Sequence, residues 1–343
     1  MRKILLCVAA MFAVVGCSKS DVVGEGEPKE DVVEVNFNVK VNGHSTKGSG
    51  EKFGINADDN TLCTLDLFVF RTEEGQDDYG VLEFYKRLTA GECIGEINIS
   101  SELTVGKKKV VAIGNSKLMN WSNLTNLTEM GKLVASLQSE SAKNYTMCKI
   151  QDYTVNKSET INFALERLIS RVVVTGIRTK FEGTPYEGCG LNDVKIFLMN
   201  VQGKKYFLNR DAVNLQVLNN GRLVLDDVNL CAMYGILHES LATNIYDSGY
   251  NNKHYFYCYS NPITTEDETN KFTRLVIQGT INGITYYYPI VLKNLQENCS
   301  YSCDVTIMKP GSTDPSEDVS AISLNSVITV SNWQTGTPYS VVF

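Results

Sequence analysis

The sequence has few of the residues on which enzymes most often depend. Only three histidines are present, His44, His238 and His254, and none lies in an H-E-x-x-H arrangement. No serine lies in a G-x-S-x-G turn, and the glycine-rich stretch at 48–54 lacks the spacing of a phosphate-binding loop. We therefore expect no catalytic residue, no cofactor and no metal ion. A catalytic triad assembled from distant parts of the chain is the remaining route to an enzyme, and it would require His238 or His254.

Positive charge is also scarce. The chain of 343 residues carries 32 Lys and Arg against 39 Asp and Glu, which gives a formal net charge of −7. The only basic block is the lysine triplet at 107–109, and one triplet in an acidic chain makes a poor track for phosphates. We interpret the triplet as a solvated turn or strand edge, and we expect no nucleic-acid partner.

The apolar run near the start is too short to cross a bilayer. Residues 4–15 follow Arg2 and Lys3 and have the length of the apolar part of a secretory signal. The run ends in V-V-G-C, which resembles the bacterial lipoprotein signal box. We predict that 1–16 are a signal peptide, that Cys17 receives lipid, palmitate included, and that the polar residues 17–30 are a tether. Several acyl chains on one cysteine make a stable membrane anchor.

Cysteine is present, but not in the spacing of a metal site or of a disulfide-stapled small domain. No Cys-x-x-Cys occurs, and a chain of this length does not need disulfides to fold. We interpret the cysteines beyond the signal as buried free thiols, although export would permit disulfides. These cysteines are Cys63, Cys93, Cys148, Cys189, Cys231, Cys258, Cys299 and Cys303.

The clearest strand in the sequence is followed directly by a polar segment. Apolar residues alternate with polar ones over 33–41, which predicts a strand with one buried face. The polar, turn-rich residues that follow contain Lys47 within H-S-T-K-G-S-G, a peptide typical of the substrates of trypsin-like proteases. A good strand is thus joined to the chain by a segment that a protease can cut. The apolar residues of the strand are Val33, Val35, Phe37, Val39 and Val41.

Most of the remaining chain predicts short strands. The best helix candidate is 126–139, where Leu127, Met130, Val134 and Leu137 recur at helical spacing. Strands separated by Gly, Asn and Asp turns indicate a mainly β fold of two antiparallel β-sandwiches with one or two short helices. A boundary near Arg167 divides it into domains 31–166 and 167–343. Acidic groups in turns, such as 266–268, are interpreted as solvated.

Nearly a dozen motifs, in family order, resemble the fimbrillins, the two-domain pilus subunits of the Bacteroidales type V pili. The resemblance covers essentially the whole exported chain and implies transthyretin-like sandwich domains. Besides the lipoprotein signal, the first strand and its basic loop, the motifs are LDLFVF, VVAIGNS leading into NLTEM, ERLISRVVV, KIFLMNVQ, YFYCYSN, YYYPIVL, YSCDVTIMKPGSTDP and ITVSNWQ.

The resemblance implies a route of assembly. The lipoprotein precursor reaches the cell surface at the outer membrane, a trypsin-like protease cuts after a basic residue behind the first strand, and the strand leaves. The C-terminal strand of another subunit then fills the groove, head to tail, and the resulting fimbrium supports adhesion to a host or bacterial surface ligand. Lys47 matches the cut, although family sites are often arginine, and Lys52 and Lys40 are lesser candidates. The donor is expected at 322–333, with apolar residues Ile322, Leu324, Ile328, Val330 and Trp333.

Other interpretations stay open. The chain could be an anchor subunit, which would keep Cys17 and its first strand, or a tip subunit, which would need a further binding module. It could be a surface lipoprotein that binds glycans through a platform at Tyr286, Tyr287 and Tyr288. The strand at 322–333 could also be simply the last strand of the second domain.

Overall fold

A computed structural model describes residues 31–41, 61–118, 120–141, 144–231, 235–319, 324–332 and 338–342. Within these ranges the chain is mainly β, with strands β1 to β20 and two short α-helices, α1 (Leu127–Gly131) and α2 (Leu225–Leu230). The prediction of a mainly β fold with one or two short helices is confirmed. The arrangement as two sandwiches stays a prediction.

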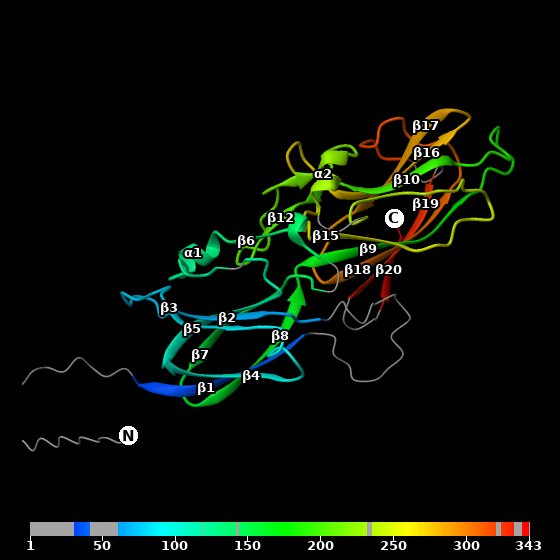
Figure 1. The fold of residues 1–343 in the computed structure, drawn as a ribbon. Helices are drawn as coiled ribbons and strands as arrows, with labels where there is room; N and C mark the ends of the chain where they lie inside the picture. Colours follow the sequence, from blue (N-terminus) through cyan, green and yellow to red (C-terminus); the bar gives the residue numbers. More distant parts are fainter. Residues whose placement is uncertain are drawn as a thin grey trace, which may run out of the picture. The chain divides into compact units, whose positions relative to one another are not determined.

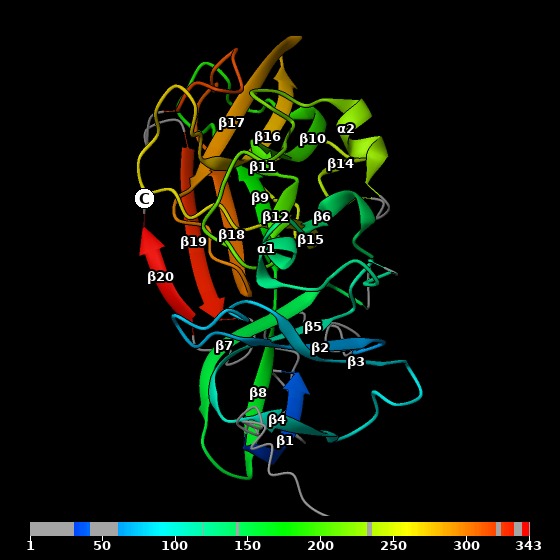
Figure 2. The same cartoon turned by 90° about the vertical axis from the view of Figure 1, so that its left-hand side faces the viewer.

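Seven strands form the largest sheet, in the order β3-β2-β5-β7-β8-β1-β4. The sheet curls so that its two edge strands, β3 and β4, come into contact. There the Glu83 carboxylate in β3 accepts a hydrogen bond from the Thr104 backbone N–H in β4 at 2.7 Å. Figures 1 and 2 show β1, in blue, beside β8 and β4. The bounds are β1 Val32–Val41, β2 Leu65–Arg71, β3 Leu82–Leu88, β4 Ile97–Thr104, β5 Gly106–Gly114, β7 Met147–Val155 and β8 Glu159–Arg167.

The side chains inside this curled sheet form one hydrophobic cluster, which we call the first core. β2 shows how the sequence specifies it. Leu65 and Leu67 point into the first core, whereas Phe68 and Phe70, on the opposite face, belong to a second core. Because both faces of β2 are covered, its sequence is a nearly continuous apolar run rather than an alternation.

The second core contains Phe68 and Phe70 of β2 together with many buried side chains from the strands that follow residue 168. A five-stranded sheet has the order β15-β9-β18-β19-β20 and a four-stranded sheet has the order β14-β10-β16-β17. Both sheets contribute side chains to the same core. The strands are β9 Ile169–Thr179, β10 Asn192–Met199, β14 His238–Ser240, β15 His254–Tyr259, β16 Thr273–Ile281, β17 Ile284–Leu292, β18 Cys299–Ile307, β19 Leu324–Asn332 and β20 Pro338–Val342.

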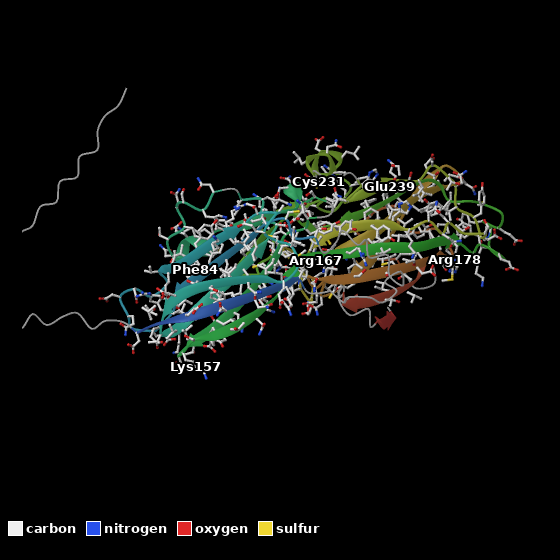
Figure 3. All side chains as sticks on the ribbon, turned by 60° about the horizontal axis from the view of Figure 1, so that its bottom comes forward. Phe84, Lys157, Arg167, Arg178, Cys231 and Glu239 are labelled. Carbon is white, nitrogen blue, oxygen red and sulfur yellow. The ribbon has the colours of Figure 1, made fainter. Side chains whose placement is uncertain are left out.

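Two small pairings complete the described sheets. β11 (Val201–Gln202) pairs with β13 (Val217–Leu218), and β6 (Val134–Ser136) pairs with β12 (Lys204–Tyr206). The second pairing joins residues from before and after Arg167. At Arg167 itself the chain passes from β8 in one sheet to β9 in another, and the buried guanidinium donates to the Asn298 side-chain oxygen at 3.0 Å. Figure 3 labels Arg167 at this passage. A domain boundary at 166/167 stays a prediction.

The helix expected over 126–139 is much shorter. The Asn126 side chain caps α1 by accepting a hydrogen bond from the Glu129 N–H at 3.0 Å, and the helix ends at Gly131. Residues 134–136 form β6 and residues 137–139 a 3₁₀ turn. Met130 and Leu137 of the apolar stripe are fully buried, but pairing with β12 overrides the helical spacing beyond Gly131.

The lysine triplet is a second correction. Residues 107–109 lie within β5, where side chains alternate between the two faces. Lys108 points inward and is buried, and its ammonium lies 2.7 Å from the Glu83 carboxylate. The interpretation as a solvated block is therefore wrong for the middle lysine, which helps to hold β3, β4 and β5 together where the sheet closes.

Candidate functional site

The first strand, β1, occupies an interior position in its sheet. It pairs antiparallel with β4 over eight residue pairs, from Val32 opposite Thr104 to Val39 opposite Ile97. On its other side it pairs in parallel with β8, from Val35 opposite Glu159 to Val41 opposite Leu165. The predicted strand at 33–41 is confirmed, and both of its edges are bonded to neighbouring strands.

The inward face of β1 belongs to the first core. Val35, Phe37 and Val39 are fully buried and Val41 is nearly so, whereas Val33 is half-buried near the start of the strand. This burial follows the alternation in the sequence residue by residue.

An aromatic cluster holds the middle of β1. The Phe37 ring is stacked on that of Phe84 in β3, with centroids 6.4 Å apart, and lies 6.2 Å from that of Phe163 in β8. Phe84 is labelled in Figure 3. Contacts of this kind contribute beyond the area they bury. The sequence of β1 does not indicate these partners, although the alternation of Ile161, Phe163 and Leu165 is a signal for the buried face of β8.

The outward face of β1 is polar. The Asn38 amide donates to the Glu96 carboxylate at 2.6 Å and to the Asn98 side-chain oxygen at 3.2 Å. The Lys40 ammonium lies 3.6 Å from Glu96, and both side chains are exposed. The hydrogen bond from Asn38, aided by the charge of Lys40, holds the pKa of the Glu96 carboxyl below its usual range. The outward face therefore adds specific polar contacts to a strand held mainly by its core face.

The two processing residues predicted from the sequence, Cys17 and Lys47, lie outside the described residues, as does the whole of 42–60. Lipidation and cleavage stay predictions. What the structure gives is the strand that precedes this segment and, after it, residues 61–64 leading into β2.

The expected donor residues lie near the other end of the chain. β19 pairs with β18 along its full length, from Leu324 opposite Ile307 to Asn332 opposite Cys299, and also with β20. Leu324 and Ile328 are buried in the second core, whereas Val327, on the opposite face, is 43% exposed. β20 is one of the two edge strands of this sheet.

The remaining donor residues are only partly placed. The backbone of Val330 pairs with that of Tyr301, and Ile322 and Trp333 lie outside the described residues. In the free chain β19 is thus a strand of its own sheet, and a role as donor requires it to leave β18.

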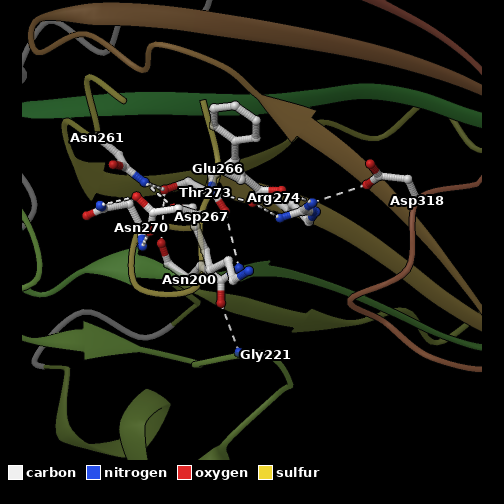
Figure 4. A network of polar contacts seen from close by, with 11 residues as sticks. Asn200, Gly221, Asn261, Glu266, Asp267, Asn270, Thr273, Arg274 and Asp318 are labelled. Carbon is white, nitrogen blue, oxygen red and sulfur yellow. Dashed lines mark hydrogen bonds and ion pairs between the residues drawn. The ribbon is translucent and has the colours of Figure 1, made fainter. Parts of the chain in front are cut away.

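The acidic residues Glu266 and Asp267 accept hydrogen bonds from protein groups. Figure 4 shows Glu266 and Asp267 in a polar network. Glu266 accepts a bond from the Arg274 guanidinium at 2.8 Å, and Asp267 accepts from the backbone N–H of Asn270 at 2.7 Å. The interpretation of these carboxylates as solvated is wrong for Glu266. The described residues contain no group of three or more His, Cys, Asp or Glu placed to hold a metal ion.

The two histidines named for a triad make local contacts. His254 Nε2 lies 2.9 Å from the Tyr250 hydroxyl, and His238 Nε2 lies 3.3 Å from the Ser240 hydroxyl. Burial lowers the pKa of both imidazoles, while the nearby charge of Glu239 acts in the opposite direction. These contacts fit half-buried strand residues in β14 and β15.

The proposed tyrosine platform for glycans is not an open surface. Tyr288 is fully buried and donates its hydroxyl hydrogen to the Lys309 carbonyl at 3.2 Å. Tyr286 packs on the second core, and Tyr287 packs on a small cluster of Phe197, Met199 and Val276. Tyr286 and Tyr287 are half-buried on opposite faces of the strand, so that the three rings do not form one platform.

Comparison with known proteins identifies the fold. No protein-family model and no curated protein matches the chain. Among the described residues, no helix has the length and apolar character needed to span a bilayer. Solved structures do match. A candidate cell adhesion protein from Parabacteroides distasonis is 14% identical, with 90% of this chain and 99% of that chain covered at a TM-score of 0.64.

Two further matches come from Porphyromonas gingivalis. A fimbrilin (FimA) is 16% identical, with 91% of this chain and 98% of that chain covered at a TM-score of 0.60. The tip fimbrial protein Mfa3 is 11% identical, with 88% and 100% covered at a TM-score of 0.52. The chain therefore has a fimbrillin-like fold over most of its length.

Proposed function

We propose that this chain is a structural subunit of a cell-surface pilus that supports adhesion, exported as a lipoprotein through Cys17, cut after Lys47 and polymerised by donor-strand exchange. The observation that carries the proposal is the position of β1. It is an interior strand of its sheet, yet the chain joins it to the next strand only through 42–60. A single cut there frees β1 and breaks no other described strand.

The energetics favour replacement of β1 over an empty groove. Burying the four core side chains of β1 at ~1.5–3 kcal/mol each gives roughly 6–12 kcal/mol as an upper estimate. That is comparable with the ~5–15 kcal/mol that stabilises a typical whole domain. Loss of the strand also leaves the main-chain groups of β4 and β8 unpaired, and an added strand satisfies such groups. The cut subunit therefore gains a strong affinity for an incoming strand.

β19 is the proposed donor. It has nine residues against ten in β1, and it carries apolar residues on one face. If Ile328 takes the Phe37 position, a donor running in the same direction as β1 places the small Ser326 at the Val35 position rather than in the aromatic cluster. This register places the larger Ile328 side chain beside Phe84 and Phe163, where the Phe37 ring lies in the precursor. Because donor and groove lie on different strands of one chain, the contact is head-to-tail and generates an open filament.

The decisive experiment treats purified precursor with trypsin and follows the new N-terminus and the assembly state together. We expect a terminus at Gly48 and the appearance of SDS-resistant ladders. Lys47→Gln abolishes the terminus at Gly48, and Lys47→Gln combined with Lys52→Gln abolishes the ladders as well, whereas Lys52→Gln alone, a matched change in the same segment, leaves both unchanged. A synthetic peptide of residues 322–333 caps the groove and shortens the ladders, and a scrambled peptide does not.

A persistent lipidated terminus at Cys17 with no ladder would refute the polymerising role. That outcome would favour an anchor subunit, which keeps its first strand, or a surface lipoprotein outside any pilus. Cleavage at Gly48 without ladders would refute β19 as the donor for another copy of this chain, and mixing with other pilus subunits would then identify the partner.

A further inference from the structure

The chain that leads into β19 is bound to a different sheet. β18 and β19 are neighbours in the five-stranded sheet, whereas β17 is an edge strand of the four-stranded sheet. Between β18 and β19, the described residues 309–319 make their backbone bonds to β17. We call residues 309–319 the clamp. It ties the start of the proposed donor to a sheet to which β19 does not belong.

Backbone bonds hold the first half of the clamp on β17. Tyr287 and Ser312 exchange both of their backbone hydrogen bonds, at 2.7 and 3.1 Å, and the buried Tyr288 hydroxyl donates to the Lys309 carbonyl at 3.2 Å. Gly311 lies between these contacts. A Cβ atom there would lie 2.2 Å from the Tyr287 carbonyl oxygen, which accepts the bond from Ser312. The clamp can therefore approach β17 this closely only with glycine at 311.

Charge and apolar packing hold the other end of the clamp. The Arg274 guanidinium in β16 is buried, donates to Glu266 at 2.8 Å and donates to the Asp318 carboxylate at 3.2 Å, as Figure 4 shows. The Asp318 side chain is 67% exposed, so that this ion pair makes a modest contribution. The next residue, Val319, packs against the second core. The clamp is thus bound at both ends.

The short connection from the clamp limits how far β19 can move. Four residues, 320–323, separate Val319 from Leu324, and this connection spans about 18 Å at most when fully extended. With the clamp in place, the start of a detached β19 therefore stays close to its own subunit. Release of the clamp lengthens the free chain between β18 and β19 to 308–323, with a reach of roughly 60 Å.

We propose that the clamp is an autoinhibitory contact, whose release from β16 and β17 is a required step in freeing β19. Gly311 and Arg274 are positioning residues that hold it closed. The inference rests on the proposed function only for its consequence, which is that β19 then fills the groove of a second copy of this chain. In the uncut monomer it makes a prediction of its own, which is that the clamp and β19 open together.

Native-state hydrogen exchange of the uncut, full-length chain tests this prediction without any assembly. Gly311→Ala should raise the exchange rates of the Ser312 amide and of the β19 amides by the same factor, roughly tenfold or more, because the added methyl group overpacks the closed state. Asp318→Asn removes only an exposed charge, so that it keeps the fold safe, and it should raise both rates about two- to fivefold.

Matched variants provide the controls. At Gly91 an added Cβ atom meets nothing within 4 Å, and the Asp314 side chain bonds to Ser316 within the clamp itself. Gly91→Ala and Asp314→Asn should therefore leave exchange of the β19 amides unchanged. After trypsin treatment, Gly311→Ala and Asp318→Asn should form ladders faster than the parent chain, in that order.

Two results would overturn the inference. One is faster exchange at Ser312 with unchanged exchange in β19, because the clamp would then open alone. The other is exchange of the β19 amides in the parent chain no faster than in β9, an interior strand of the same sheet, because β19 would then open only by global unfolding. Faster exchange of β19 without ladders supports the clamp and refutes the proposed polymerisation, so that the two failures are distinguishable.

Discussion

β1 and β18 have the same surroundings in two different sheets. Each pairs in parallel with one of two consecutive strands, β8 for β1 and β9 for β18, and antiparallel with a neighbour on its other side, β4 or β19. Each buries one apolar face, and each presents polar residues on the other, such as Asn38 in β1 and Asp304 in β18. By pairing and burial alone, neither strand is easier to remove.

The difference lies in the covalent connections. β18 follows β17 after residues 293–298, and the lysine behind it, Lys309, precedes Pro310. Proline fixes the backbone and lacks an N–H group, which hinders cleavage at that bond by trypsin-like proteases. β1 is followed by 42–60, with Lys47 and Lys52 next to glycine and phenylalanine. Under the proposed function, the linker rather than weak pairing makes β1 the strand that leaves.

The largest expected effect comes from removing β1 altogether. A chain that begins at residue 48 should lose roughly 6–12 kcal/mol of stabilisation from apolar burial, and the seven-stranded sheet should unfold or aggregate. A peptide of residues 32–41 added in trans should restore a cooperative unfolding transition, measured by circular dichroism and by native-state hydrogen exchange of β4 and β8.

The control peptide carries Phe37→Asp and Val39→Asp, which place charges in the first core and should prevent rescue. Stable folding of the shortened chain without any peptide would contradict the interpretation of β1 as an integral strand.

A matched pair of valines distinguishes the two strands after assembly. Val39 in β1 and Val305 in β18 are both fully buried, so that valine to alanine at either site should destabilise the precursor by about 2–3 kcal/mol through lost transfer energy and a cavity. In the polymer, Val39→Ala should have no effect, because β1 has left, whereas Val305→Ala should still destabilise. Denaturant unfolding of both forms measures this, and equal effects of Val39→Ala in both would mean that β1 is retained.

The sequence predicted β1 well for a physical reason. A strand with one face in a core must alternate, and no other arrangement of 33–41 buries all five apolar residues. Alternation is a signal local to one strand. It could not show that β19 pairs on both sides, because pairing depends on residues far away along the chain. Cys17, Lys47, Ile322 and Trp333 lie outside the described residues and stay predictions.

The errors also have long-range causes. Lys108 is buried because Glu83, on another strand, supplies a negative charge at 2.7 Å, and the local sequence K-K-K contains no trace of that partner. The helix predicted at 126–139 ends early because β12, some seventy residues further along, pairs with 134–136. Helical spacing is a local signal, and a tertiary strand pairing overrides it.

Smaller effects concern the polar faces. In β18, Asp304 accepts two hydrogen bonds from Arg178, at 2.8 and 3.1 Å, on a partly exposed surface. Asp304→Asn should destabilise the chain by about 0.2–1 kcal/mol, less at high salt, because exposed pairs are screened. Denaturant midpoints at low and high ionic strength provide the measurement. A loss of stability that does not change with salt concentration would indicate that the packing of the Asp304 side chain, not its charge, stabilises this site.

The smallest effect, and the one specific to β1, is a change in the titration of Glu96. In the precursor the hydrogen bond from Asn38, aided by Lys40, lowers the pKa of this carboxyl from its ordinary value of 4.5. A lowered pKa means that the contact stabilises the folded chain above the unfolded-state pKa, and that this stabilisation is lost as the pH falls through the folded-state value. When β1 leaves, Asn38 and Lys40 leave with it, and the pKa of Glu96 should return toward 4.5 unless the incoming strand supplies an equivalent donor.

Carbon-13 NMR titration of the Glu96 side-chain carboxyl in the precursor, the Asn38→Ala precursor and the assembled form measures this pKa directly. The Asn38→Ala precursor should titrate close to the ordinary value even though β1 is present. A Glu96 pKa that remains equally low in all three would place its cause in β4 itself, and β1 and β18 would then differ only in their linkers.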